Sequence, residues 1–564
     1  MYRPDLSPVG DSLALSALVA ALPLLTLFVL LGGLRLKAHW AGLAALGTSV
    51  VVAVWAYDMP VDLALLVGTE GAAFGLFPIM WIVLAALWVH QLTVTSGRFA
   101  DLRRAFNLVS DDPRIQALII AFCFGALLEA LAGFGAPVAI TGVMLLALGF
   151  SPARAAVTVL VANTAPVAFG AIATPIITAG TLTDIDYADI GAYIGRQTPL
   201  LALFVPLLLV VLVDGVRGLR QTWPAAVVCG GAFAVAQFVS SNYISVELTD
   251  IIASLVALGA VVAFLRVWRP AEGERVREDL RVAAEREHRE AGGSGPPPAE
   301  AQQAAEAERA GAAGSLSRGR ILQAFVPYLV VIAVFSVAKL WDPAKEFLAD
   351  SDVSVSWPGL DGEVLTATGE QSSTTVYVFP WLSSPGSLLV LCGILVAVVH
   401  RVRALDAVRE FARTVLTLRW ALLTVGSVLA LAYVMNLSGQ TITIGTWIAG
   451  AGAAFAFLSP LLGWLGTAVT GSDTSANALF ATLQQTAAGE AGLDPTLLVA
   501  ANTSGGVVGK MISPQNLTIA ATAVGLLGKE AVLFRKTIGW SVLLLLAICL
   551  LVLLQSHVLA WMLP

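Results

Sequence analysis

The segment that decides the fold runs from Glu129 to Pro175, reading EALAGFGAPVAI over residues 129–140 and VLVANTAPVAFGAIATP over residues 159–175. It places a glutamate, a Gly-Phe-Gly-Ala-Pro break and an Asn-Thr pair inside sequence that is otherwise apolar. An uninterrupted helix satisfies its own backbone polar groups in hydrocarbon, so such interruptions indicate backbone that opens toward a protected cavity. The segment therefore predicts a binding site inside a membrane.

The composition of the whole chain is that of a polytopic membrane protein. Of its 564 residues, 57% are hydrophobic and only 12% are charged, whereas soluble proteins carry about 25% charged residues. The net charge of −6 says little about partners because most charged residues lie in loops. Residues 1–12 are polar and the apolar run 13–34 is long enough to span a bilayer, so we expect no cleavable signal peptide.

Loop charges orient the chain. Arg35 and Lys37 follow the first apolar run, which places this loop in the cytoplasm and the N-terminus outside. The acidic cluster 184–189, which has no nearby base, and the acidic loop 342–376, which has Lys345 as its single base, are predicted outside. The expected total is roughly twelve to fourteen membrane segments. The uninterrupted spans are predicted at 13–34, 40–57, 190–213, 222–240, 250–268, 321–341, 377–399, 414–436, 441–465 and 537–563, and an overlong, interrupted span at 63–95.

A low-complexity stretch divides the chain. Residues 269–320 are rich in Ala, Glu, Arg, Gly and Pro, cannot bury a core, and are interpreted as a cytoplasmic linker with some helix before GGSGPPP. The first membrane half, 1–268, holds the broken-helix motifs at 129–175. The second half, 321–564, holds an acidic outer loop, 342–376, and broken-helix motifs at 470–516. The predicted fold class is all-α, with two pseudo-repeated halves that contain broken helices or re-entrant hairpins.

The repeat is visible in the polar interruptions. Aligning Asn163 with Asn502 sets an offset of 339 (502 minus 163), which also pairs Ala162, Thr164, Gly170 and Pro175 with Ala501, Thr503, Gly509 and Pro514. The same offset places Gly133-Phe134-Gly135 on Ser472-Asp473-Thr474. Two copies of a broken helical element are typical of secondary transporters, whose sites lie at a repeat interface near mid-membrane. By that analogy we expect the copies to be inverted in the membrane.

The two breaks offer groups suited to a small carboxylate. Asn and Thr present amide and hydroxyl groups, and half-helix N-termini present free backbone N–H groups with partial positive charge. An alternative is that the Asn-Thr pairs only cap the broken helices. The candidate substrate-binding residues are Gly133, Gly135, Asn163, Thr164, Ser472, Thr474, Asn502, Thr503 and Lys510.

Charged residues near the breaks are candidates for coupling. Glu129 and Asp473 are the closest acidic residues, and a carboxylate at the centre of a spanning helix costs about 2.5 to 3.5 kcal/mol. Each should be paired or protonatable, so both are candidate proton carriers. Lys510 could pair with either carboxylate or attract the substrate. Arg196 and Gln197 are candidate substrate or structural residues, and Arg196 could instead snorkel from a helix end.

Several classes of protein are disfavoured. The chain contains no GxxxxGK[ST] phosphate loop, no HExxH motif, and no set of residues that resembles a nucleophile with its base, so neither an ATP-driven pump nor an enzyme is expected. We expect no cofactor and no bound metal. The cysteines lack metal-ligand spacing and are interpreted as small buried hydrophobes; they are Cys123, Cys229, Cys392 and Cys549.

At these stretches the chain resembles the lactate permease family of proton-coupled monocarboxylate transporters. The matching strings are EALAGFGAPVAI, VANTAPVAFGA, GRQTPLLALF, TGSDTSANALF, LVAANTSGGVVGKMISPQN and GLLGKEAVLFR. More distantly, the paired Asn-Thr breaks are similar to the Ser-Asn-Thr turns that tip re-entrant hairpins in the wider ion transporter superfamily. The linker and the acidic outer loop look unlike a minimal family member.

The resemblance implies uptake of L-lactate, with D-lactate and glycolate as further substrates, by proton symport across the plasma membrane of a prokaryote. The expected partners are a small carboxylate, the proton and the lipid bilayer, with a homodimer left open and no nucleic acid. Two alternatives remain. The alternative within transport is a sodium-coupled carboxylate transporter, and the alternative of a different class is a passive channel for small anions.

Overall fold

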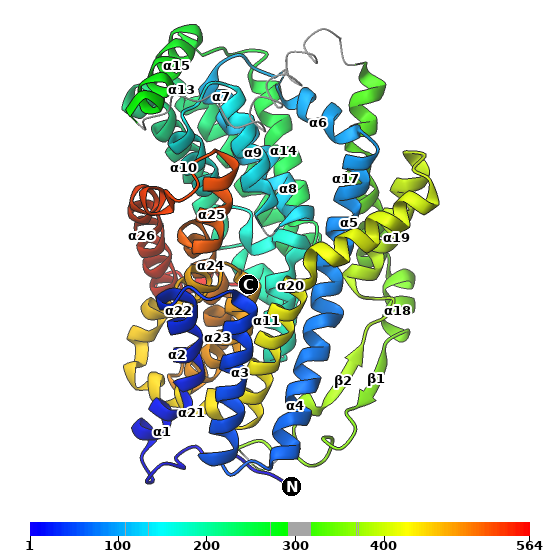
Figure 1. Ribbon diagram of the computed structural model, residues 1–564, viewed down its shortest axis with the longest axis vertical. Coiled ribbons are helices and arrows are strands. Elements are labelled where there is room, and N and C mark those ends of the chain that lie inside the picture. Colours follow the sequence, from blue (N-terminus) through cyan, green and yellow to red (C-terminus); the bar gives the residue numbers. More distant parts are fainter. Residues whose placement is uncertain (108, 134, 271, 291–316, 368, 370) are drawn as a thin grey trace.

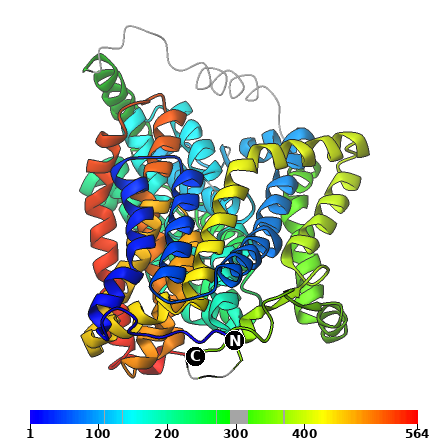
Figure 2. The same ribbon diagram turned by 60° about the horizontal axis from the view of Figure 1, so that its bottom comes forward.

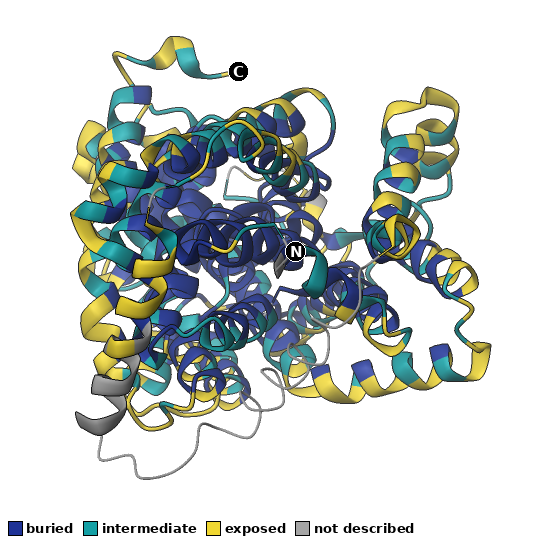
Figure 3. Cartoon of the chain, turned by 90° about the horizontal axis from the view of Figure 1, so that it is seen from above, coloured by how far each residue is buried: buried dark blue, intermediate teal, exposed yellow. Residues whose placement is uncertain are grey.

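A computed structural model describes the chain except for residues 108, 134, 271, 291–316, 368 and 370 (Figure 1). The described part is almost entirely helical. Its strands form one antiparallel hairpin, in which β1 (Val353–Ser356) pairs with β2 (Val376–Phe379). Buried residues concentrate in the middle of one helical body, and the segment around α18 and α19 projects from its side with more exposed residues (Figure 3).

The helices of the first half begin at Leu13. In chain order they are α1 (Leu13–Ala20), α2 (Leu22–Phe28), η1 (Val29–Gly33), α3 (Ala38–Trp55), α4 (Val61–Phe74), η2 (Gly75–Met80), α5 (Trp81–Thr95), α6 (Arg98–Asn107), α7 (Pro113–Gln116), η3 (Ala117–Phe124), α8 (Gly125–Ala132), α9 (Ala136–Ala147), α10 (Pro152–Ala162), η4 (Val167–Phe169), α11 (Gly170–Thr183), α12 (Tyr187–Ile194), α13 (Thr198–Tyr243), α14 (Thr249–Phe264) and α15 (Gly273–Glu290).

The helices of the second half begin at Arg318. They are α17 (Arg318–Leu340), α18 (Asp342–Asp350), η5 (Ser373–Thr375), α19 (Pro385–Val399), α20 (Ala404–Leu437), α21 (Gln440–Ile448), η6 (Ala449–Ala454), α22 (Phe455–Thr470), α23 (Asp473–Glu490), α24 (Pro495–Gly509), η7 (Lys510–Ile512), α25 (Pro514–Ala523), α26 (Glu530–Gln555) and η8 (Ala560–Met562).

The protein is a multi-pass membrane protein. Within the described residues, nine helices are long and apolar enough to cross a membrane, or ten if α10 and the segment Val167–Thr183, bent by 64°, count as one span. Three shorter apolar helices, α9, α14 and α19, accompany them, and with these the total falls within the expected range of roughly twelve to fourteen.

Several predicted boundaries were wrong. The expected span 190–213 begins in α12, and its helix starts only at Thr198; the spans 190–213 and 222–240 are separated, as predicted, by a kink within α13, where the backbone of Asp214 and Gly215 is not helical. The expected span 377–399 starts in β2, and its helix α19 begins only at Pro385, where the Ser384 side chain caps it by accepting from Gly386 N. The expected outer loop 342–376 contains α18 and β1.

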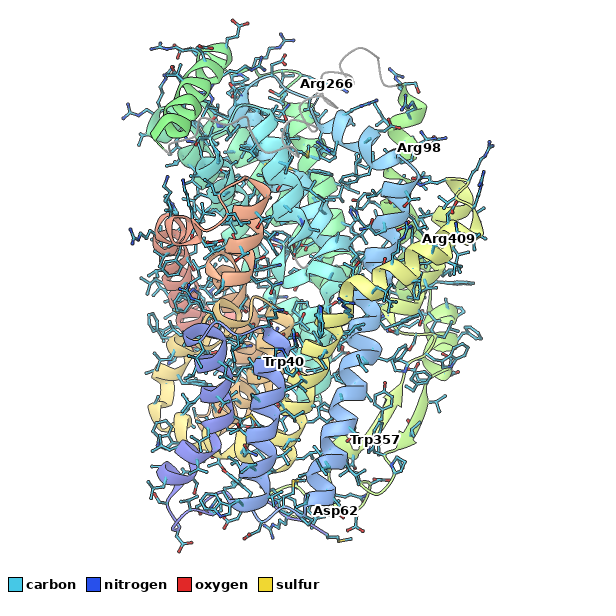
Figure 4. The ribbon with its side chains drawn as sticks, viewed as in Figure 1. Trp40, Asp62, Arg98, Arg266, Trp357 and Arg409 are labelled. Carbon is cyan, nitrogen blue, oxygen red and sulfur yellow. The ribbon has the colours of Figure 1, made fainter. Side chains whose placement is uncertain are left out.

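The ends of the molecule differ in charge. Arg98 and Arg266 lie at the end opposite to Asp62 (Figure 4). The N-terminus lies opposite to α15, which begins the linker, and the C-terminus lies at the same side as the N-terminus (Figure 2). The orientation with the N-terminus outside and residues 269–320 in the cytoplasm remains a prediction from loop charge.

Each half contains a helical hairpin with a broken tip. The α8–α9 hairpin turns at Gly133 and Gly135, and Gly135 has a φ of 88° that favours glycine. Phe134 lies outside the described residues. The α22–α23 hairpin turns at Gly471, with a φ of 80°, and Ser472. Both tips abut α25, because a Cβ at Gly135 would lie 2.3 Å from Ile519 and one at Gly471 would lie 2.5 Å from Gln515.

The broken helices that follow the hairpins run in opposite directions. α10 lies above α11 in Figure 1, whereas α24 lies below α25. α11 ends beside α23, whose Gln485 Nε2 donates to Thr183 O at 2.7 Å, close to the turn that starts α24. α25 ends beside α9, because a Cβ at Gly142 would lie 3.5 Å from Val524 Cγ1. The copies are therefore inverted, as expected.

The break expected at Asn502 and Thr503 was wrong. α10 ends at Ala162, directly before Asn163, but α24 continues through Asn502 to Gly509 and breaks only at η7. Pro166 explains the difference, because its ring lacks an N–H group and clashes with the carbonyl of Ala162 in a continuous helix. At the offset of 339, the residue that corresponds to Pro166 is Gly505, which is compatible with a continuous helix.

Glycines let α24 pack closely against α22. A Cβ at Gly505 would lie 2.0 Å from Pro460 O, one at Gly463 would lie 1.8 Å from Asn502 O, and one at Gly509 would lie 2.4 Å from Trp464 O. Small residues bring helix backbones together in membranes, where van der Waals contact replaces the hydrophobic effect as the driving force. This contact holds the second hairpin against its broken helix.

Gly505→Ala should therefore destabilise the protein by about 1 to 3 kcal/mol, because the added methyl group overpacks against backbone atoms. The measurement is thermal unfolding of the purified protein in detergent. Gly489→Ala on α23 is the matched control, since a Cβ there meets nothing within 4 Å. Equal melting temperatures for both variants would contradict the close approach of α22 and α24.

Candidate substrate and coupling site

A buried ion pair joins the two halves at their breaks. Lys510 Nζ donates to Glu129 Oε1 at 2.6 Å, and the two residues are 8% and 2% exposed. Glu129 lies on α8 one turn before the hairpin tip, and Lys510 begins η7, the interruption between α24 and α25. Of the partners left open for Lys510 by the sequence, the structure selects Glu129.

Asn163 completes the coordination of the carboxylate. Its Nδ2 donates to Glu129 Oε2 at 2.9 Å, so each carboxylate oxygen has a donor. Two glycines leave room for the group: a Cβ at Gly170 would lie 3.0 Å from Glu129 Oε1, and one at Gly133 would lie 3.5 Å from the same atom. Residues from both breaks of the first half, the hairpin tip and the break after α10, therefore surround Glu129.

A narrow crevice lies where the two breaks meet. It is lined by Leu160, Asn163, Thr164, Lys510, Met511 and Asn516. Thr164 Oγ1 donates to Val161 O at 2.7 Å, and Asn516 Nδ2 donates to Lys510 O at 3.1 Å. The crevice thus presents an ammonium, two amides and a hydroxyl, which are the groups that bind a carboxylate and a neighbouring hydroxyl.

The second Asn-Thr pair lies in a different cluster. Asn477 Oδ1 accepts from Asn502 Nδ2 at 2.9 Å and from Thr503 Oγ1 at 3.0 Å, and Asn502 Oδ1 accepts from Gln484 Nε2 at 3.2 Å. All four residues are 0% exposed. Within the described structure Asn502 and Thr503 make no hydrogen bond with Asn163 or Lys510. These contacts fasten α24 to α23.

The tip of the second hairpin holds another buried carboxylate. Ser472 caps α23 by accepting from Ser475 N at 3.3 Å. Asp473 Oδ1 accepts from Thr467 Oγ1 at 3.2 Å, while Asp473 Oδ2 has no hydrogen-bond partner among the described groups. Lys510 is the charged neighbour of this carboxylate, and Thr474 is buried beside it.

Arg196 and Gln197 make structural contacts. Arg196 Nε donates to Asn242 Oδ1 at 3.0 Å and its Nη1 donates to Met562 O at 2.6 Å, which ties the turn before α13 to the C-terminal segment. Gln197 Oε1 accepts from Ser504 Oγ at 2.6 Å. Neither residue contacts the Glu129 pair in the described structure.

The sequence does not single out Asp250, which is a third buried carboxyl group. It lies at the edge of the predicted span 250–268, where acidic residues are common. In the structure it lies in the first turn of α14, is 0% exposed, and has Glu129 and Lys510 as its charged neighbours. The available signal was one acidic residue directly before the apolar run IIASLVALGAVVAF, with no base close by in the sequence.

A cleft of about 1230 Å³ reaches the second hairpin. Its walls include Arg35 and Lys37 from the loop between η1 and α3, Ser472 and Ser475 at the start of α23, and Gln515 on α25. The cleft therefore connects a basic loop, predicted to be cytoplasmic, with the tip that abuts α25.

The site combines one ammonium group with buried carboxyl groups. Among the described residues, no group of three or more His, Cys, Asp or Glu side chains could hold a metal ion. Lys510 pairs with Glu129 and is a charged neighbour of the buried carboxyl groups of Asp250 and Asp473. Isolated charges are costly in such surroundings, so an arrangement of this kind can couple the binding of an anion to the protonation of a carboxylate.

Inverted broken helices around a buried ion pair define a multi-pass membrane protein built like a secondary transporter. The profile of the L-lactate permease family matches residues 16–559. The chain belongs to this family, which confirms the resemblance seen in the sequence.

Two relatives of known name are more than 40% identical to this chain over nearly its full length. The glycolate permease GlcA of Escherichia coli K12 is 43% identical over 566 residues, covering 99% of this chain and 98% of the relative. The L-lactate permease of Bacillus subtilis strain 168 is 41% identical over 575 residues, covering 99% of both chains. Among solved structures, the YdaH transporter of Alcanivorax borkumensis covers 88% of this chain and 89% of its own, at 15% identity and a TM-score of 0.46.

The ion pair between Lys510 and Glu129 should contribute to the free energy of unfolding. Lys510→Met should cost about 3 to 5 kcal/mol, because it leaves Glu129 buried without its counter-charge. The double variant Lys510→Met with Glu129→Gln should recover much of this loss, since no buried charge remains in the pair. Thermal unfolding in detergent at neutral pH measures both. If the double variant is no more stable than Lys510→Met, the two side chains are not coupled.

Proposed function

We propose that this protein takes up L-lactate and related small 2-hydroxymonocarboxylates, including D-lactate and glycolate, by proton symport across the plasma membrane of a prokaryote. The observation that carries the proposal is the buried pair of Glu129 and Lys510, which links the two inverted repeats at their breaks. Membership of the L-lactate permease family supports the substrate class.

In this mechanism the substrate carboxylate replaces Glu129 as the partner of Lys510. When Glu129 takes up a proton, its attraction for the ammonium falls, and Lys510 is free to bind lactate. Proton and anion therefore enter together and add no net charge to the buried site. This matters because charge is costly in a region without water. In this proposal Asn163, Thr164 and Asn516, which line the crevice, receive the 2-hydroxyl group.

In this proposal the cleft is the path between the site and the cytoplasm. The crevice between the breaks is narrow, so lactate reaches it only when a hairpin tip moves away from α25. Arg35 and Lys37 raise the local concentration of anions in the cleft. Gln515 on α25 lies against Gly471 at the α22–α23 tip and also lines the cleft. It therefore marks the inner end of this path.

The transport proposal is tested with purified protein in liposomes. An inward proton gradient should drive accumulation of labelled L-lactate above the external concentration, without sodium. Accumulation that depends on sodium, with the same pH on both sides of the membrane, would identify sodium and not the proton as the coupling ion. Uptake without accumulation and without stimulation by lactate on the far side would indicate a passive channel.

The path is tested by thiol labelling. The native cysteines, Cys123, Cys229, Cys392 and Cys549, are all buried, so Gln515→Cys introduces the one readily accessible thiol of the described residues. We expect a membrane-impermeant maleimide to label it from the cytoplasmic side, and lactate to slow that labelling severalfold. Labelling only from the outside would reverse the predicted orientation, and no labelling from either side would contradict an aqueous cleft.

A further inference from the structure

The buried carboxyl group of Asp250 has no role in the exchange between Glu129 and lactate described above. Asp250 is 0% exposed, and neither of its oxygens has a hydrogen-bond partner among the described groups. Its polar neighbour on α13 is Gln237, whose Nε2 donates to Ala165 O at 3.3 Å. A buried polar group without partners is costly, and a buried charge without partners costs far more.

Charges around Asp250 come from two other elements. α8 contributes Glu129, and η7 contributes Lys510, while α13 offers the neutral amide of Gln237. Lys510 is also the charged neighbour of Asp473. Lys510 is therefore a charged neighbour of all three carboxyl groups, but its hydrogen bond, at 2.6 Å, goes to Glu129. Lys510 and these three carboxyl groups, called the Lys510 cluster below, carry no net charge only when two of the three carboxyl groups hold protons.

A purely structural role for Asp250 explains these contacts less well. An acidic residue in the first turn of a helix is favourable because of the helix dipole, and such residues commonly accept backbone N–H groups. Asp250 accepts none. It is also buried on α14, which packs against the α8 helix that carries Glu129, and not in water, where the dipole interaction would carry no desolvation cost. A protonated carboxyl group resolves both difficulties.

We propose that Asp250 is a further coupling residue, which holds a proton and exchanges it with Glu129; this role rests on the proton symport proposed above. The step is the transfer of one proton from the Asp250 carboxyl group to the Glu129 carboxylate, leaving Asp250 ionised and Glu129 neutral. Lys510, released from Glu129, then binds the substrate anion and remains near the new charge on Asp250. Return of a proton to Asp250 from water resets the cluster.

Asp250→Asn tests this role, because it keeps the shape of the side chain and cannot release a proton. In proteoliposomes we expect proton-driven accumulation of L-lactate to fall at least about tenfold. Counterflow, in which loaded carrier exchanges labelled for unlabelled lactate, should stay within about twofold of wild type, since exchange requires no net proton release. Asp250→Glu should restore part of the accumulation.

Glu70→Gln is the matched control. Glu70 is a buried carboxyl group on α4, 1% exposed, with one oxygen that lacks a partner, and its charged neighbour is Asp361 rather than the Lys510 cluster. Glu70→Gln should leave both the accumulation and the counterflow of lactate unchanged.

The outcomes separate the two proposals. Failure of wild type to accumulate lactate overturns the symport itself. Normal accumulation by Asp250→Asn, or equal loss of accumulation and counterflow in a variant that elutes as folded protein, overturns the role of Asp250 alone. If Asp250→Asn does not fold, the pH dependence of accumulation by Asp250→Glu decides, and a profile identical to wild type counts against the role.

Discussion

The contact between Lys510 and Glu129 is the constraint on which the rest of the site depends. Neither charge is stable by itself in a region shielded from water, so each half of the protein requires the other at this point. The requirement acts across the repeat interface, because the two residues come from different halves. It also means that neutralising one partner would leave the other without its counter-ion.

The structure around this pair shows how an inverted repeat becomes asymmetric. The first copy supplies one carboxylate, with glycines at 133 and 170 that make space for it. The second copy supplies the ammonium and a continuous helix that packs against its hairpin through glycines. A single difference, proline at 166 against glycine at 505, decides where each helix breaks. Equivalent positions therefore serve different purposes, and Asn163 binds a carboxylate while Asn502 holds two helices together.

Both hairpin tips rest against one short helix, α25. Movement of either tip would alter the surroundings of the crevice, because α25 follows directly after Lys510 and the break in η7. Under the symport proposed above, a change of protonation at the centre would be converted through α25 into opening toward one side. The cleft beside the α22–α23 tip shows the side to which the described conformation is open.

Much of this protein was determined by its sequence alone. Apolar spans, the repeat at offset 339, the two hairpin tips and the family follow from local features: hydrocarbon tolerates few polar interruptions, so each one is informative. Other features depended on tertiary structure. The choice of Glu129 as the partner of Lys510, the continuity of α24, the separate cluster around Asn502 and the place of Asp250 all result from packing between distant segments. Sequence spacing contains no information about which buried groups meet, because those contacts are set by how the helices cross.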